Sequence, residues 1–401
     1  MADTLPPELG DRVIDFLHDD SRALSACSLT CRSWLPVARY HRWSHTRLER
    51  SRLLEFVGLL VDAPDLASFI SRLDFYDSSG SIRRRMGTLR ICQPDEFDLV
   101  LKVLPNLRSL HLEYWLILEE VAEIAAANPT FCALDELALL NCDVETLDTA
   151  AKLMAIPYPS LNSICLSAIQ LKDAENPGTQ DKSPWIPALE HRPAAKKLLL
   201  SGLYATEVMS LFEWISGSVT SLQIVIQNEN DAPIVGAMLS SVGHALIELD
   251  LVVDTDNSLQ AVFHESGFSL TGLPALRHCS LTFNLREMFV PGNISLPWIS
   301  TFLQELSSNY LDTIILKLRA DDLEDLRALD SECGVREIHP VLFDDLEALD
   351  WTSLESSTAT GRLPSLKRII VEGRGNSLRF LSLIHVMHKP LKPLLQLRTL
   401  Q

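Results

Sequence analysis

The chain has 401 residues, of which 47% are apolar, and its 35 basic and 53 acidic side chains give a net charge of −18. This apolar content excludes a mainly disordered chain, and the acidic balance argues against nucleic acid and anionic membrane surfaces as partners. The eight cysteines are too scattered for a secreted disulfide framework, and without a basic leader or an apolar run of about 20 residues we expect a cytoplasmic or nuclear protein with no membrane span.

The first fifty residues predict a module of three short helices. Apolar residues at intervals of three to four predict a first helix over about residues 7–18. The side that we expect to face inward consists of Leu5, Leu9, Val13, Phe16 and Leu17. Asp19-Asp20-Ser21 supplies residues that cap helices, and the buried side of the second helix is expected to comprise Leu24, Cys27 and Leu29. A third apolar cluster begins at Trp34, and Pro36 is expected to delay the start of the third helix.

The same segment resembles an F-box over about residues 3–45. The resemblance rests on Leu5-Pro6-Pro7-Glu8-Leu9, on Val13-Ile14 with Leu17, and on Cys27-Ser28-Leu29-Thr30-Cys31-Arg32-Ser33-Trp34. It implies that the module docks onto a Skp-type adaptor, which a cullin scaffold holds in turn. The residues that it assigns to this contact or to its support are Leu5, Pro6, Leu9, Ile14, Leu17, Leu24, Leu29 and Trp34. A small helical core without docking would use the same residues, and this alternative stays open.

From residue 70 onward one phrase recurs: an apolar residue, two variable ones, an apolar residue, one variable one and a third apolar residue. This phrase is typical of the strands of leucine-rich repeats. The central residues of its ten copies are Leu73, Leu110, Leu137, Ile164, Leu198, Leu222, Leu249, Cys279, Ile314 and Ile369. The copies that start at Leu107, Leu134 and Leu161 are 27 residues apart, within the range of about 20 to 29 that such repeats show.

Segments with helical spacing, such as those that contain Val121 and Leu147, alternate with these strands. The alternation predicts an α/β fold: a leucine-rich-repeat horseshoe with parallel strands on the concave face and helices outside. We expect three parts: an F-box domain over 1–47, a linking or capping helix over 48–69, and a repeat domain over 70–401. Two copies also place Cys142 and Asn284 where these repeats carry Cys or Asn, whose side chain satisfies backbone groups inside the turn.

The variable strand residues of such an array point to its concave face, where an extended partner can touch many repeats. The candidates for binding a target there are Tyr76, His111, Glu113, Glu248, Asp250, His278, Lys317 and Arg368, beside Asp74, Glu136, Lys197, Gln223 and Glu372. Any solvated face would show a similar mixture. Trp185 and Trp298 lie in long polar insertions and are further candidates as interface anchors, with packing against the repeats as the alternative.

Catalytic motifs are missing from the sequence: it has no Gly-x-Ser-x-Gly elbow, no phosphate loop, no His-Glu-x-x-His and no dinucleotide fingerprint. Cys27 and Cys31 lack the turn-like ligand pairs of a zinc site, so we expect no metal and no cofactor. The leading hypothesis is a non-catalytic substrate-recognition subunit of an SCF-type E3 ubiquitin ligase, which binds an unknown protein target. The alternatives are a leucine-rich-repeat interaction scaffold not coupled to ubiquitination and, third, an enzyme built on the loops.

Overall fold

The computed structural model describes residues 7–86, 89–154, 156, 160–172, 195–202, 216–226, 231–253, 270, 272–284, 305–306, 308–319, 363–374 and 395–400. The chain divides into two compact units, Met1–Ala195 and Lys196–Gln401. Both units belong to the α/β class and consist of parallel strands. None of the described helices is long and apolar enough to cross a bilayer.

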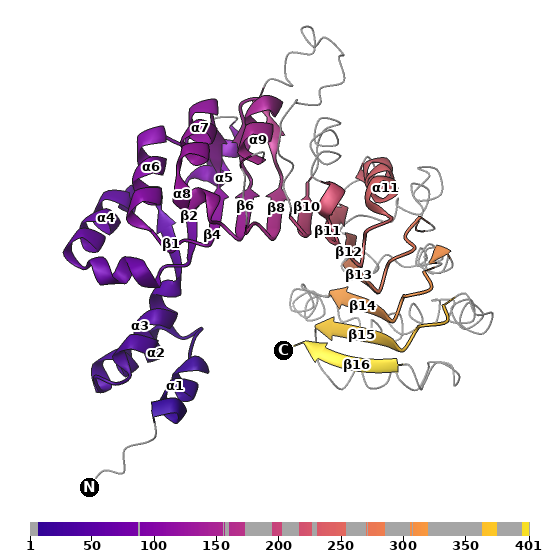
Figure 1. Ribbon diagram of the computed structural model, residues 1–401, viewed down its shortest axis with the longest axis horizontal. Helices are drawn as coiled ribbons and strands as arrows, with labels where there is room; N and C mark the ends of the chain where they lie inside the picture. Colours follow the sequence, from indigo (N-terminus) through magenta and orange to yellow (C-terminus); the bar gives the residue numbers. More distant parts are fainter. Residues whose placement is uncertain are drawn as a thin grey trace, which may run out of the picture. The chain divides into compact units, whose positions relative to one another are not determined.

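The first unit begins with the three predicted helices, α1 (Pro7–Asp15), α2 (Ser21–Thr30) and α3 (Leu35–Ser44) (Figure 1). The Asp20 carboxylate caps α2 and accepts from the backbone N–H groups of residues 22 and 23 at 3.0 and 2.9 Å. Pro36 falls in the first turn of α3, where its missing N–H costs nothing. The small core of the module consists of Ile14, Leu24, Cys27 and Ala38, with Leu17, Trp34 and Val37 packed against it.

The prediction of which side of α1 faces inward was wrong. Leu9, Val13 and Phe16 are exposed; the buried side of α1 consists of Gly10 and Ile14, and the half-buried Leu17 follows the helix on the same side. Both sets fit helical spacing, and a short helix can turn only one of them toward α2 and α3. Gly10 decides the choice, because a Cβ atom there would lie 2.9 Å from Nε1 of Trp34. Leu29, also expected to be buried, is exposed near the end of α2.

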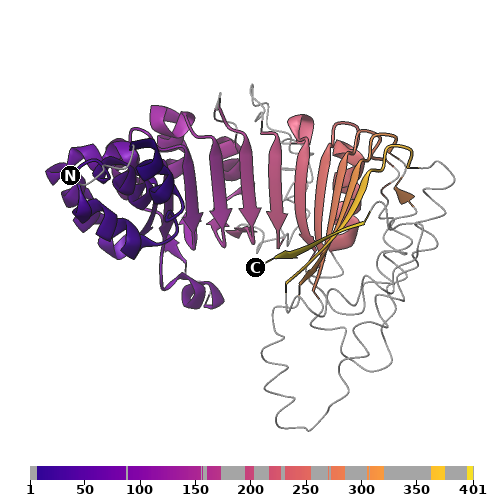
Figure 2. The same cartoon turned by 90° about the horizontal axis from the view of Figure 1, so that it is seen from below.

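Five long strands follow in the first unit and pair in parallel, each with the next (Figure 2). They are β1 (His45–Glu49), β2 (Arg72–Tyr76), β4 (Ser109–Glu113), β6 (Glu136–Leu140) and β8 (Ser163–Ser167). Strand β1 was not predicted, because Thr46 occupies the central position of its phrase: it pairs in register with Leu73. The expected capping helix over 48–69 is shorter, since this stretch contains the end of β1 and then α4 (Leu53–Asp62).

Short strands and helices complete each repeat of the first unit. The short strands β3 (Arg90–Ile91), β5 (Trp115–Ile117), β7 (Asp143–Val144) and β9 (Gln170–Leu171) form a second parallel sheet. The connecting helices are η1 (Arg50–Arg52), η2 (Pro64–Phe69), α5 (Gly80–Arg85), α6 (Pro94–Val103), α7 (Glu119–Ala127), α8 (Pro129–Cys132) and α9 (Leu147–Met154). Helices α4, α6, α7 and α9 pack one against the next along one side of the strands.

A repeated turn joins each long strand to its short one. The residue after β4, β6 and β8 has a positive φ, 63° at Tyr114, 54° at Asn141 and 51° at Ala168. Just after one such turn the buried Cys142 donates through Sγ to the carbonyl of Leu112 at 3.3 Å, which confirms its predicted role. In the preceding repeat the equivalent residue is Trp115, whose Nε1–H donates to the carbonyl of Phe75 at 2.9 Å. The side chain of Asn284 lies outside the described residues.

The second unit continues the same strand phrase. Its strands pair in parallel, each with the next in the chain. They are β10 (Lys197–Ser201), β11 (Ser221–Ile226), β12 (Glu248–Val253), β13 (His278–Asn284), β14 (Thr313–Arg319), β15 (Arg368–Arg374) and β16 (Leu395–Leu400), with η4 (Ser216–Ser218) and α11 (Asp231–Val242) among the connections. All ten predicted central residues, in both units, lie in strands and are buried, so the phrase marks the core correctly.

Candidate functional site

The N-terminal helices leave an apolar surface exposed to water. Leu9 and Val13 lie on α1, Phe16 directly follows the last residue of α1, and Leu29 lies near the end of α2; we call these four residues the helical apolar surface. Phe16 is 86% exposed and Leu29 is 87% exposed. Single apolar side chains on a surface need no explanation, but several on so small a module make these helices one candidate binding surface.

The structure divides the eight residues that the F-box resemblance assigns to the adaptor. Leu9 and Leu29 belong to the helical apolar surface, whereas Ile14 and Leu24 are buried and Leu17 and Trp34 are half-buried in the module's core. Leu5 and Pro6 lie outside the described residues. Val13 and Phe16, which the sequence placed inside, join the exposed set. The six residues of this set that the structure describes therefore divide between candidate contacts and the core that supports them.

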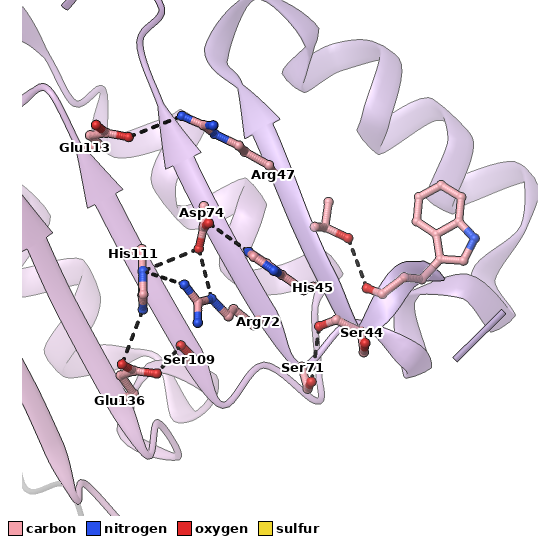
Figure 3. Close-up of polar contacts among 12 residues, drawn as sticks. Ser44, His45, Arg47, Ser71, Arg72, Asp74, Ser109, His111, Glu113 and Glu136 are labelled. Atoms are coloured by element: carbon pink, nitrogen blue, oxygen red, sulfur yellow. Dashed lines mark hydrogen bonds and ion pairs between the residues drawn. The ribbon is translucent and has the colours of Figure 1, made fainter. Parts of the chain in front are cut away.

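A second candidate surface is a polar network on the first unit. Strand alternation turns Leu73 and Phe75 of β2 into the core and Asp74 to the opposite side, which we call the open face. On it the Asp74 carboxylate lies between three side chains (Figure 3). His45 Nε2 is 2.8 Å from its Oδ2, and Arg72 Nε donates to its Oδ1 at 3.2 Å. The network therefore joins β1 to β2 through side chains as well as through the backbone.

His111 on β4 extends the network toward β6. Arg72 Nη2 lies 3.2 Å from His111 Nδ1. The same Nδ1 atom lies 3.4 Å from Oδ1 of Asp74, and the other ring nitrogen, on the side of β6, is Nε2. That nitrogen lies 3.5 Å from Oε1 of Glu136, and Ser109 Oγ donates to Oε2 of the same carboxylate at 2.8 Å. His111 thus links the two carboxylates of the open face.

Both carboxylates of this network titrate below their ordinary range. The contact with His111 and the hydrogen bond from Ser109 outweigh burial and lower the pKa of Glu136 to about 2. For Asp74 burial is the largest single effect and raises the pKa, but hydrogen bonds from His45 and Arg72 together outweigh it, so that the pKa is lowered. The network is therefore anionic at both positions throughout the neutral range.

Acid is expected to destabilise the first unit through Glu136. An unfolded glutamate titrates near pH 4.3, so the stabilisation is complete above that pH and is lost as the pH falls toward the folded pKa of about 2. The lowering of the Glu136 pKa alone corresponds to about 3 kcal/mol of unfolding free energy, and partial exposure of the side chain reduces the expected effect to about 1 kcal/mol. Urea unfolding at pH 6 and pH 3 should show a loss that Glu136→Gln reduces by about 1 kcal/mol and that Glu120→Gln, on the exposed surface of α7, leaves intact, while the lowered pKa of Asp74 keeps part of the loss in both variants. An equal acid loss in Glu136→Gln would contradict the assignment.

The other predicted target residues of the first unit also lie on the open face. Glu113 Oε2 is 3.6 Å from Nη2 of Arg47, and the Arg47 guanidinium lies 4.4 Å above the centre of the Tyr76 ring. Sequence reasoning missed Arg47 and His45, because strand β1 itself was not predicted. It also left out Arg72, although the alternation of β2 was enough to place it on this face.

In the second unit the predicted residues form local pairs. Lys317 Nζ on β14 binds Oδ2 of Asp250 on β12 at 3.0 Å, across the intervening strand β13. Further contacts join His278 Nδ1 to Asp312 Oδ1 at 3.2 Å and Arg368 Nη2 to Thr313 Oγ1 at 3.1 Å. Glu248 and Lys197 are exposed, Gln223 is half-buried and Glu372 is buried. Trp185 and Trp298 lie outside the described residues. Across the described part of the chain, no group of three or more His, Cys, Asp or Glu side chains is placed to hold a metal ion.

Comparison with known proteins gives little further information. No family model matches the sequence, and no curated protein matches it. Among solved structures, the chain is similar to one described as the crystal structure of the Rad7 and Elc1 complex in yeast, with 14% identity and a TM-score of 0.35 over 98% of this chain and 92% of that one. At this TM-score the likeness carries no argument about fold or function.

Proposed function

We propose that the chain is the substrate-recognition subunit of an SCF-type E3 ubiquitin ligase, acting in the cytoplasm or the nucleus. The observation that carries the proposal is the helical apolar surface on a three-helix module, in the segment that resembles an F-box and directly ahead of the strand repeats. In this function the helical apolar surface docks onto a Skp-type adaptor, which a cullin scaffold holds. The residues of the module core, such as Ile14 and Leu24, support that contact without making it.

The repeat units would bind the protein target. Their open faces carry charged and polar side chains in fixed pairs, which suits recognition of another protein's polar surface. The chain itself then performs no chemistry. It raises the effective concentration of its target near the enzyme that transfers ubiquitin.

Complex formation with purified components tests this proposal. The full chain mixed with a Skp-type adaptor should elute as a one-to-one complex in size-exclusion chromatography with light scattering, and adding a cullin should give a ternary complex. Affinity capture from cells with the proteasome inhibited should then retain a target beside adaptor and cullin. A chain that elutes alone with every adaptor tried would refute the proposal.

The second candidate is a leucine-rich-repeat scaffold that is not coupled to ubiquitination. The side-chain pairs on the strands suit a scaffold as well as they suit a substrate-recognition subunit, because both bind another protein. The amount of the target protein in cells distinguishes the two functions. In cells that express a variant unable to bind the adaptor, a ligase target accumulates, whereas the partner of a scaffold keeps its level.

A further inference from the structure

The two arginine side chains on the open face of the first unit are more exposed than the carboxylates beside them. Arg47 is 63% exposed and Arg72 39%, whereas the carboxylates of Asp74, Glu113 and Glu136 are 20%, 24% and 33% exposed. The carboxylates therefore lie deeper and the cations nearer to solvent. A partner that approaches this face meets positive groups first, although the chain as a whole is acidic.

Most of these polar groups already have partners. Asp74 is engaged by His45 and Arg72, and Arg72 also reaches His111. Arg47 differs from them: within the described residues its one polar contact is with Glu113 at 3.6 Å, an ion pair too long for a hydrogen bond. Its guanidinium therefore keeps its N–H groups available to a ligand.

Tyr76 holds this guanidinium in place. The Arg47 Cζ atom lies 4.4 Å from the centre of the Tyr76 ring, within the range of a cation–π contact. A guanidinium held by one of its faces still presents its planar set of N–H groups at its edges, in the spacing that matches two carboxylate oxygens. Since Tyr76 fixes the side chain in advance, less conformational entropy is lost when a ligand binds.

We propose that Arg47 binds an aspartate or glutamate side chain of the target, presented by an extended segment that lies along the open face of β1, β2 and β4. This inference rests on the proposed function only in that the target supplies the carboxylate. Tyr76 acts as a positioning residue, because it holds Arg47 and does not itself bind the acid.

The surroundings favour a single carboxylate over a phosphate group. Glu113 lies 3.6 Å from the Arg47 guanidinium, and Glu49 shares the same side of β1. A phosphate carries nearly two negative charges at neutral pH and would be repelled by both carboxylates, while gaining one available guanidinium. A run of acidic residues would meet the same repulsion. The binding site therefore selects one isolated acidic side chain.

Peptide libraries test the proposal on the full chain. The probes are immobilised nine-residue peptides, random except for a central residue fixed as glutamate, phosphoserine, serine or lysine. We expect the glutamate library to retain about fivefold more protein than the serine library, because a charge-assisted hydrogen-bonded pair contributes about 1 kcal/mol at a partly exposed site. A preference for lysine or phosphoserine, or equal retention by all four libraries, would overturn the proposal.

Substitutions assign the preference to Arg47. Arg47→Gln should reduce glutamate retention to that of serine, while Arg52→Gln, an exposed arginine outside the open face, should leave it unchanged. Arg47→Lys keeps the charge but loses the planar set of guanidinium N–H groups, so it should retain only part of the preference for glutamate. Tyr76→Phe keeps the ring and should behave as the parent chain, whereas Tyr76→Leu should weaken the preference several-fold. Full preference in Arg47→Gln would sink the assignment.

Adaptor binding, measured on the same proteins, separates this inference from the proposed function. Arg47→Gln should still form the complex with the Skp-type adaptor, which also shows that the variant is folded. If the parent chain prefers glutamate but binds no adaptor, the proposed function fails and the carboxylate site stands. If it binds the adaptor without any peptide preference, the inference fails alone.

Discussion

Replacing Val13 and Phe16 together by lysine is expected to abolish binding to a Skp-type adaptor and to leave the fold intact. Val13 on α1 is 48% exposed and Phe16, directly after the helix, is 86% exposed, so the free chain loses little when they change. In a complex, each would lose about 1.5 to 3 kcal/mol of apolar burial, and two buried charges would add a further penalty. A total above about 4 kcal/mol weakens the affinity at least 1,000-fold.

Lysine is the better choice of charge at these positions. Helix α1 ends at Asp15, and a cation near a helix C-terminus interacts favourably with the exposed carbonyl groups, whereas a carboxylate there would destabilise the helix. A loss of binding in the lysine variant therefore reports on the surface and not on an unfolded helix. Isothermal titration calorimetry measures the affinity, and far-ultraviolet circular dichroism checks the fold.

The matched control is a second apolar pair on another helix of the same unit. Leu54 and Val61 on α4 are 79% and 72% exposed, and their double replacement by lysine makes the same chemical change outside the helical apolar surface. This control should bind the adaptor as the parent chain does. Equal loss in both double variants would point to a general effect of charge, and unchanged binding by the α1 variant would exclude that surface as the docking site.

The repeat core could be predicted from sequence because its signal is local. The strand phrase places two buried residues two positions apart, and this alternation depends on strand geometry alone. Cys279 was identified by the same phrase although it is not a leucine, and it is fully buried. Strand β1 was missed since Thr46 at its central position is polar, even though it pairs with Leu73 as a repeat residue should.

The candidate surfaces were harder to predict because they depend on relations between segments. The spacing of α1 fits two different faces, and only the packing of Trp34 against Gly10 shows which one is buried. The polar network depends on the register between strands: Arg72 and His111 lie 39 residues apart in the chain and meet because their strands pair directly. Loops of irregular length hide such registers in the sequence. The alternation identified Asp74 and His111 as open-face residues, but not their partners.

Trp115 is expected to be among the residues that stabilise the first unit most. Its ring is fully buried and stacks on Phe75 with centroids 4.7 Å apart, and its Nε1–H satisfies the Phe75 carbonyl at 2.9 Å. Trp115→Ala should lower the free energy of unfolding by about 4 kcal/mol, because it leaves a cavity and an unpaired carbonyl. Trp115→Phe keeps an aromatic ring against Phe75 but removes the donor, and should cost about 2 kcal/mol.

Hydrogen exchange with mass spectrometry is the appropriate measurement, because a chain of two compact units need not unfold in one step. Each repeat of a stacked array contacts mainly its neighbours, so exchange should accelerate in β2 and β4 and stay near the parent rate in β8. The difference in exchange rate between Trp115→Ala and Trp115→Phe separates the contribution of the indole N–H donor from that of the ring packing. If Trp115→Phe exchanges as slowly as the parent chain, the indole hydrogen bond contributes nothing measurable to stability. Trp115 and Cys142 would then occupy equivalent positions in their repeats without the same stabilising role.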